Sequence, residues 1–188
     1  MLTEIRTPRL LLRSLVEADR DEYLRVHQVS EAFFAPWSPL QMGTLEEAFR
    51  TDMAKVEAGR AHGTHFRMVG VLEDGRIAGF FNLGEIVRGV FHNAYASWKV
   101  NVEVARRGYG TEAVTALLDF AFSREGAALH RIQANVIPSN TPSMRLAERL
   151  GLRREGVAER YLEIAGRWQD HVMFARTAEE HRFTYLRA

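Results

Sequence analysis

Cysteine is absent from this chain of 188 residues, which excludes thiol catalysis and zinc sites built on cysteine. The apolar run at residues 10–12 is too short for a signal sequence, and no apolar run approaches the roughly 20 residues that a membrane span needs. A formal net charge of +1 gives no overall field that would select nucleic acid over other partners. We therefore expect a cytoplasmic protein with no membrane partner, no direct nucleic-acid recognition and no metal.

What the chain does contain is ordinary for one globular domain. Hydrophobic residues make up 46% of the sequence and charged residues 26%. A chain of this length buries roughly 70% of its unfolded surface without disulfides or metals. No repeat, low-complexity tract or linker divides it. The sequence therefore predicts a single domain over residues 1–188.

Hydrophobic periodicity and turn signals predict strands and helices along the whole chain. Thr44 and Glu47 have the spacing of a capping box at a helix start, and Gly59 would end that helix. Asp74 and Gly75 predict a hairpin turn. The expected strands are residues 9–15, 64–72, 77–87, 91–104, 130–137, 153–164 and 167–176, and the expected helices are residues 17–28, 44–57, 110–125 and 143–150.

Residues 33–39 combine three aromatic side chains with two prolines. The prolines argue against a regular element, while the aromatic rings are unusual for a solvated loop. Two interpretations fit this composition. Either the rings fold back onto the core, or they form one wall of a substrate cleft.

Residues 100–113 place a strand, a glycine turn and a helix start in immediate succession. Valines at alternate positions from residue 100 to residue 104 predict the strand, and Gly108 and Gly110 bracket the turn. The free N–H groups of a helix start, its dipole and two adjacent arginines suit a phosphate or pyrophosphate. Glycines needed for the turn alone are the alternative.

The strand, helix and strand between residues 91 and 137 form a crossover, which makes the two strands parallel. Antiparallel hairpin strands precede this unit and another hairpin follows it. The sequence therefore predicts an α+β fold whose mostly antiparallel sheet contains one parallel pair.

The order of these elements and the residues at their joints resemble the GNAT superfamily of N-acetyltransferases, which use acetyl-coenzyme A (acetyl-CoA). The resemblance covers nearly the whole chain and is closest to the RimJ/RimL branch, which acetylates the N-terminal amines of ribosomal proteins, and to its RimJ-type alanine acetyltransferases. It implies αβα layers around a sheet of about seven strands, with a splayed parallel pair at the centre. The stretches that carry it are Pro36-Trp37-Ser38-Pro39, residues 87–92, the glycine turn with Thr111-Glu112-Ala113, and the run from His130-Arg131-Ile132 to His171.

The phosphate signature of the superfamily fits only in part. When Gly108 and Gly110 are placed on its glycines, Ala105 falls where a glutamine or arginine is usual, and Arg106 falls where glycine is common. Backbone N–H groups hold most of the phosphate contacts in such turns, and any residue except proline provides them. The departures therefore weaken a claim for side-chain contacts only.

The resemblance implies an acetyl-CoA site and an acceptor site, with no metal. It assigns Ser143 as the general acid and His92 as a base or acceptor contact. The implied cofactor residues are Val100, Val102, Arg107, Gly108, Tyr109, Gly110, Thr111, Asn135, Asn140 and Ser143. The implied acceptor residues are Phe34, Trp37, Arg88, His92 and Tyr161.

Several of these roles have an alternative in local structure. Asn140 either holds the pantetheine arm or caps the helix that follows, and Ser143 either protonates the thiolate or caps the same helix. The position of the presumed base in a related enzyme falls on or near Leu162, which cannot serve. The remaining base candidates are Glu85, His92, Glu163 and His171.

The chemistry favours an N-terminal amine as acceptor. An α-amine has a pKa of roughly 7.7 to 8.0, so about a tenth is neutral at pH 7, whereas a lysine side chain at about 10.4 is almost wholly charged. We therefore expect direct acetyl transfer to a protein α-amine, on a ribosomal protein beginning with Ala or Ser, by a monomer or homodimer. The alternatives are a small amine as acceptor, or a CoA-binding or ribosome-associated protein without catalysis.

Overall fold

The computed structural model describes residues 4–186 as eight strands in one sheet with helices on both faces. The sheet order is β1-β2-β3-β4-β5-β6-β8-β7, and every neighbouring pair is antiparallel except β5 and β6. The strands are β1 (Glu4–Arg6), β2 (Leu11–Ser14), β3 (Phe66–Val71), β4 (Ile77–Val87), β5 (Asn93–Val100), β6 (Arg131–Val136), β7 (Arg153–Ile164) and β8 (Arg167–Thr177).

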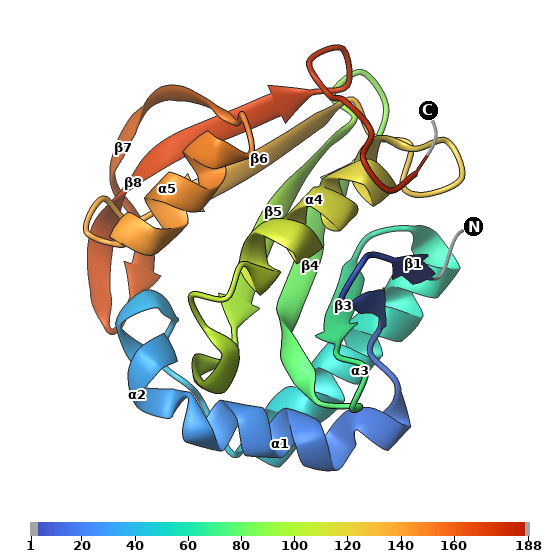
Figure 1. The fold of residues 1–188 in the computed structure, drawn as a ribbon. Coiled ribbons are helices and arrows are strands. Elements are labelled where there is room, and N and C mark those ends of the chain that lie inside the picture. Colours follow the sequence, from blue (N-terminus) through green and yellow to red (C-terminus); the bar gives the residue numbers. More distant parts are fainter. Residues whose placement is uncertain (1–3, 187–188) are drawn as a thin grey trace.

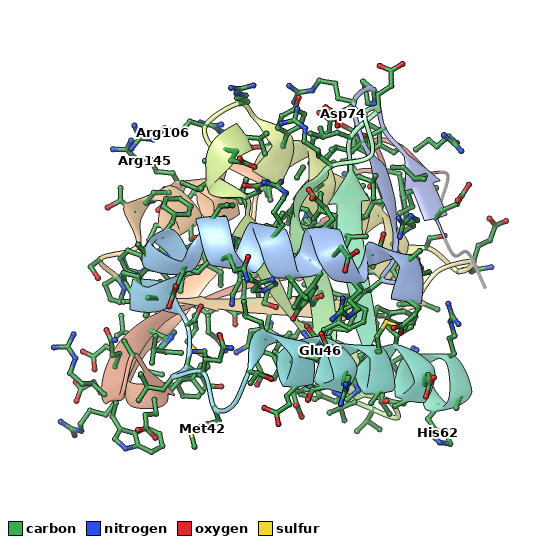
Figure 2. All side chains as sticks on the ribbon, turned by 90° about the horizontal axis from the view of Figure 1, so that it is seen from below. Met42, Glu46, His62, Asp74, Arg106 and Arg145 are labelled. Carbon is green, nitrogen blue, oxygen red and sulfur yellow. The ribbon has the colours of Figure 1, made fainter. Side chains whose placement is uncertain are left out.

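The helices form two layers, one on each face of the sheet (Figure 1). They are α1 (Arg20–Val29), α2 (Glu31–Phe34), α3 (Leu45–His62), α4 (Tyr109–Phe122) and α5 (Thr141–Arg149), with short 3-10 helices η1 (Glu17–Asp19), η2 (Ala35–Trp37) and η3 (Val102–Val104). Seen from below, α1 and α3 run next to each other along one face (Figure 2). Among residues 4–186, no helix is both long enough and apolar enough to cross a membrane.

Alternation along the strands divides the core between these layers. Phe81, fully buried, packs in the cluster that includes α4, while its neighbour Phe80 packs with Val26 of α1 and Phe49 of α3. Successive side chains of a strand point to opposite faces, so a continuous apolar run in β4 can supply both cores. The sheet therefore separates an α4/α5 face from an α1/α3 face.

The parallel pair is short, and its two strands part. Residues 93–95 of β5 pair with residues 131–133 of β6, although β5 continues to Val100 and β6 to Val136. The N–H of Asn101 donates to the carbonyl of Ala78 on β4 (2.9 Å). By alternation, the main-chain groups of Trp98 and Val100 therefore lie on the edge that β6 has left. This opening confirms the expected splay.

Three differences between the structure and the sequence prediction concern the number of strands, the end of β5 and the end of α3. The short strand β1 was not predicted and brings the sheet to eight strands. The expected strand 91–104 ends at Val100, because the side chain of Asn101 accepts from the N–H of Glu103 (3.0 Å) and turns the chain into η3. The helix from Thr44 continues to His62, where Gly63 (φ 64°) ends it.

Gly59 lies inside α3, so the prediction that it ends the helix is wrong. A Cβ at this position would lie 1.8 Å from the carbonyl oxygen of His65. Gly59 thus allows a close approach of the next segment rather than a turn. Residues 33–39 are also more regular than expected, since they contribute to α2 and η2, with Pro36 in the first turn of η2 where no donor is lost.

Candidate active site

The glycine turn leads directly into α4. Gly108 is the N-cap of α4 with φ 87°, and Arg106 also has a positive φ of 63°. A helix leaves its first N–H groups without acceptors inside the helix, and those of α4 lie in an exposed or half-buried turn. Figure 2 shows Arg106 and Arg145 of α5 extending outward on the same side of the molecule. The turn thus has the geometry and the charge of an anion site.

A buried carboxylate fastens this turn to the N-terminal segment. Glu112, 7% exposed, accepts from the hydroxyl of Thr7 (2.6 Å), the main-chain N–H of Arg9 (2.8 Å) and the guanidinium of Arg9 (2.6 Å). Arg9 also donates to the carbonyl of Arg107 (2.9 Å) and lies over the ring of Tyr109, 4.5 Å from its centre. Sequence reasoning missed Arg9, because no local pattern links it to a residue 103 positions away.

The start of α5 lies beside β5. Asn140 is the N-cap of α5, and its side-chain oxygen accepts from the N–H of Ser143 (3.3 Å). The helix-capping role left open for Asn140 is therefore confirmed, and Ser143 is not the cap. The hydroxyl oxygen of Ser143 instead accepts from the indole N–H of Trp98 on β5 (3.2 Å).

Close packing at Gly110 brings α4, β5 and α5 together. A Cβ at Gly110 would lie 3.1 Å from Val100 of β5 and 3.7 Å from Leu146 of α5. The residues predicted to hold the cofactor at the end of β5, in the glycine turn and at Ser143 are therefore neighbours on the α4/α5 face.

Val102 does not extend β5, contrary to the expectation that it pairs like a strand residue. Its N–H donates to the hydroxyl oxygen of Ser30 (3.1 Å), a fully buried residue next to α1, and it belongs to η3. Val100 is thus the last position of β5 whose main chain can offer strand-like hydrogen bonds on the open edge.

A polar cluster lies beside the opening on the other face of the sheet, away from α4 and α5. The side-chain oxygen of Asn135 accepts from Gln133 (3.1 Å), and its nitrogen lies 3.5 Å from the hydroxyl of Tyr161. Burial and a hydrogen bond with Tyr95 raise the pKa of Tyr161. Asn135 therefore shares its face with the predicted acceptor residue Tyr161, and not with α4 and α5.

His171 belongs to this cluster and is 2% exposed. Its ring lies edge-on to that of Tyr161, with 5.8 Å between the centres. Nδ1 lies 3.0 Å from the carbonyl oxygen of Gln169, which accepts only, so Nδ1 carries a proton and Nε2 is the acceptor of the neutral ring. Of the four base candidates, His171 is the one that the structure places beside Tyr161, whereas Glu85 and Glu163 are exposed.

The aromatic segment after α1, residues 33–39, lies on the same face of the sheet as Tyr161 and His171. Phe34 is buried (7% exposed) and lies beneath the ammonium group of Lys99, whereas Trp37 is 36% exposed. The carbonyl of Ser38 accepts from the N–H of Ala165 in the β7–β8 turn (2.9 Å). The interpretation that the rings fold back onto the core is confirmed for Phe34, whereas a cleft wall at Trp37 stays a prediction.

Arg88 and His92 lie at the other end of the parallel pair. Arg88 donates to the carbonyl of Ala127 (2.6 Å), and the carbonyl of His92 accepts from the N–H groups of His130 (2.9 Å) and Arg131 (3.0 Å). Trp98 follows His92 by six positions, which corresponds to about 20 Å of extended strand. The structure therefore does not bring Arg88 and His92 together with Ser143.

Comparison with known proteins agrees with this geometry. The acetyltransferase (GNAT) domain model matches residues 9–153. The chain belongs to the GNAT acetyltransferase family. It is therefore an N-acetyltransferase by family, with the mixed sheet and the parallel pair that the resemblance implied.

Individual members of the family match nearly the whole chain. The [ribosomal protein uS5]-alanine N-acetyltransferase of Escherichia coli is 29% identical over 93% of this chain and 90% of its own length. The probable N-acetyltransferase YjcK of Bacillus subtilis is 30% identical over 88% of this chain and 92% of its own. The structure of Mycobacterium smegmatis RimJ in complex with CoA-disulfide superposes with a TM-score of 0.85 at 30% identity, covering 94% of this chain and 87% of that one.

Proposed function

We propose that this protein transfers the acetyl group of acetyl-CoA to the N-terminal α-amine of a protein, and that the acceptor is a ribosomal protein beginning with Ala or Ser. The uS5-alanine acetyltransferase, similar over 93% of this chain, supports this acceptor class. CoA bound to the similar RimJ structure supports the donor.

An exposed apolar rim on the acceptor side is the observation that carries the proposal. Trp37 (36% exposed), Leu40 (63%) and Leu162 (40%) belong to this rim, which the segment after α1 and the β7–β8 hairpin build together. The contact between Ser38 and Ala165 joins the two segments. An exposed apolar surface suits an extended polypeptide, whereas a small amine is better held in an enclosed pocket.

For the donor, we propose that the first N–H groups of α4, from Gly108 to Thr111, bind the pyrophosphate, with Arg107 adding charge. The open main-chain edge at Val100 would bind the pantetheine arm as an added strand. The main-chain N–H groups of Trp98 and Val100 would stabilise the oxyanion, because they lie where β5 and β6 part.

The reaction then needs two proton transfers. The amine nitrogen attacks the thioester carbon, the C–S bond breaks, and the thiolate takes a proton from the hydroxyl of Ser143, which then regains a proton from solvent. The Trp98 indole donates to Ser143 Oγ, which leaves the Ser143 O–H free to point at the sulfur. His171 would accept the amine proton through a water, with Nε2 as the acceptor atom.

The test offers acetyl-CoA with peptides that begin with Ala or Ser and measures released thiol and peptide mass. We expect one acetyl group on the α-amine and none when the N-terminus is blocked. Spermidine and an amino sugar serve as small-amine controls. Acetylation of lysine side chains or small amines alone would refute the proposal, and CoA binding without turnover on any amine would indicate a binding protein.

A further inference from the structure

Lys99 is a basic residue on the acceptor side of the opening, and it is the next-to-last residue of β5. Its neighbour Trp98 contacts Ser143 on the α4/α5 face. Successive strand residues point to opposite faces, so Lys99 points to the face that carries Tyr95 and the aromatic segment. The ammonium nitrogen lies 5.3 Å from the centre of the Phe34 ring, a cation–π distance.

The groups around Lys99 leave its charge unbalanced. Asp52 of α3 is the nearby carboxylate, but it accepts from the hydroxyl of Tyr23 (3.0 Å) and pairs with Arg67 of β3 (3.4 Å). Burial lowers the pKa of His27 on α1, so its ring is neutral at pH 7. Within residues 4–186, no ion pair includes Lys99. Lys99 and Arg67 therefore share one nearby carboxylate, and this site has one more basic than acidic group.

We propose that Lys99 is a specificity residue that selects acceptor peptides with a carboxylate side chain at the second position. The inference rests on the proposed function, because the acceptor amine must reach the opening between Trp98 and Val100. An extended peptide advances about 3.4 Å per residue, so the side chains that follow the amine lie within reach of the lysine stem.

A carboxylate of the acceptor would complete the environment of Lys99. Burial lowers the pKa of Lys99 although the charge of Asp52 opposes this shift, so its charged form is only partly compensated. An ion pair formed in a half-buried site is stronger than one in water. The same charge repels a polyamine or a peptide with a basic second residue, so Lys99 discriminates in both directions.

The experiment compares kcat/KM for three peptides that differ only at the second residue, with Asp, Asn or Lys after an N-terminal Ala. We expect the parent protein to prefer Asp over Asn by about tenfold and to use the Lys peptide least. Lys99→Met should remove the Asp preference, Lys99→Arg should keep it, and Lys99→Glu should favour the Lys peptide. Thermal unfolding of each variant establishes that it is folded.

Lys55 on α3 is the only other lysine of the chain and provides the matched control. Lys55→Met should leave the ratio of the Asp and Asn peptides unchanged. Equal use of all three peptides by the parent protein, or an Asp preference that survives in Lys99→Met, would overturn the inference while leaving the proposed function standing. Failure to acetylate any peptide would instead count against the proposed function itself.

Discussion

At the scale of single residues, the pair Ser143 and Trp98 gives the sharpest test of the chemistry. If the hydroxyl protonates the leaving thiolate, Ser143→Ala should lower kcat by about 100-fold with little change in the KM for acetyl-CoA. The stability of the variant should change little, because the cap of α5 is Asn140. Steady-state kinetics with thermal unfolding measure both effects.

Asn140→Ala is the matched control for this substitution. It should cost about 1 kcal/mol of unfolding free energy through loss of the cap, with a smaller effect on kcat. A Ser143→Ala variant with unchanged kcat would show that the serine serves only as the acceptor for Trp98.

The sequence could name these residues but could not choose among their roles. Ser143 was open between acid and cap, and the structure decides only that Asn140 is the cap. His92 and His171 could not be ranked, because their distance from the opening depends on which end of the parallel pair each one occupies. Roles of this kind require tertiary neighbours, and a single sequence does not encode them as local spacing.

At the scale of elements, Glu112 determines how firmly the start of α4 is held. Glu112→Ala would leave the main-chain N–H and guanidinium of Arg9 and the hydroxyl of Thr7 without their acceptor. We expect a loss of about 2 kcal/mol in unfolding free energy and weaker CoA binding, because the turn would lose its attachment to the N-terminal segment. Urea unfolding and calorimetric titration with CoA measure the two effects.

Glu112→Gln separates the charge of this carboxylate from its shape. The amide oxygen can still accept one bond from Thr7 or Arg9, so the loss should be smaller than for Ala. Equal CoA affinity in the parent and in Glu112→Ala would contradict the idea that this attachment supports the anion site.

The elements that the sequence predicted well have signals contained within a few residues. The capping box of Thr44 and Glu47 and the hairpin turn at Asp74 and Gly75 are both present. The errors came where a distant segment decides the outcome. Gly59 was mistaken for a helix end because its partner, the carbonyl of His65, becomes apparent only in three dimensions.

At the scale of the whole molecule, the C-terminal segment is held against α4 by one buried carboxylate. Asp119 is fully buried and accepts from Nε2 of His181 (2.8 Å). It also accepts from the N–H groups of Thr184 (3.0 Å) and Leu186 (3.1 Å). The same helix therefore carries the proposed anion site at its start and the attachment of the C-terminal segment near its end.

This attachment predicts a specific loss of stability in acid. Burial raises the pKa of Asp119, but the hydrogen bonds from His181 and the backbone outweigh it, so the pKa in the folded state is below the usual value. A lowered folded pKa adds stability above the unfolded pKa of about 3.9, and this stability is lost as the pH falls through the folded pKa. Asp119→Ala should cost about 3 kcal/mol at pH 7 and less at pH 3, which lies below the unfolded pKa. Urea unfolding at both pH values measures this difference, with Glu73→Ala in the exposed β3–β4 turn as the control. An equal loss for Asp119→Ala at both pH values would contradict the assignment.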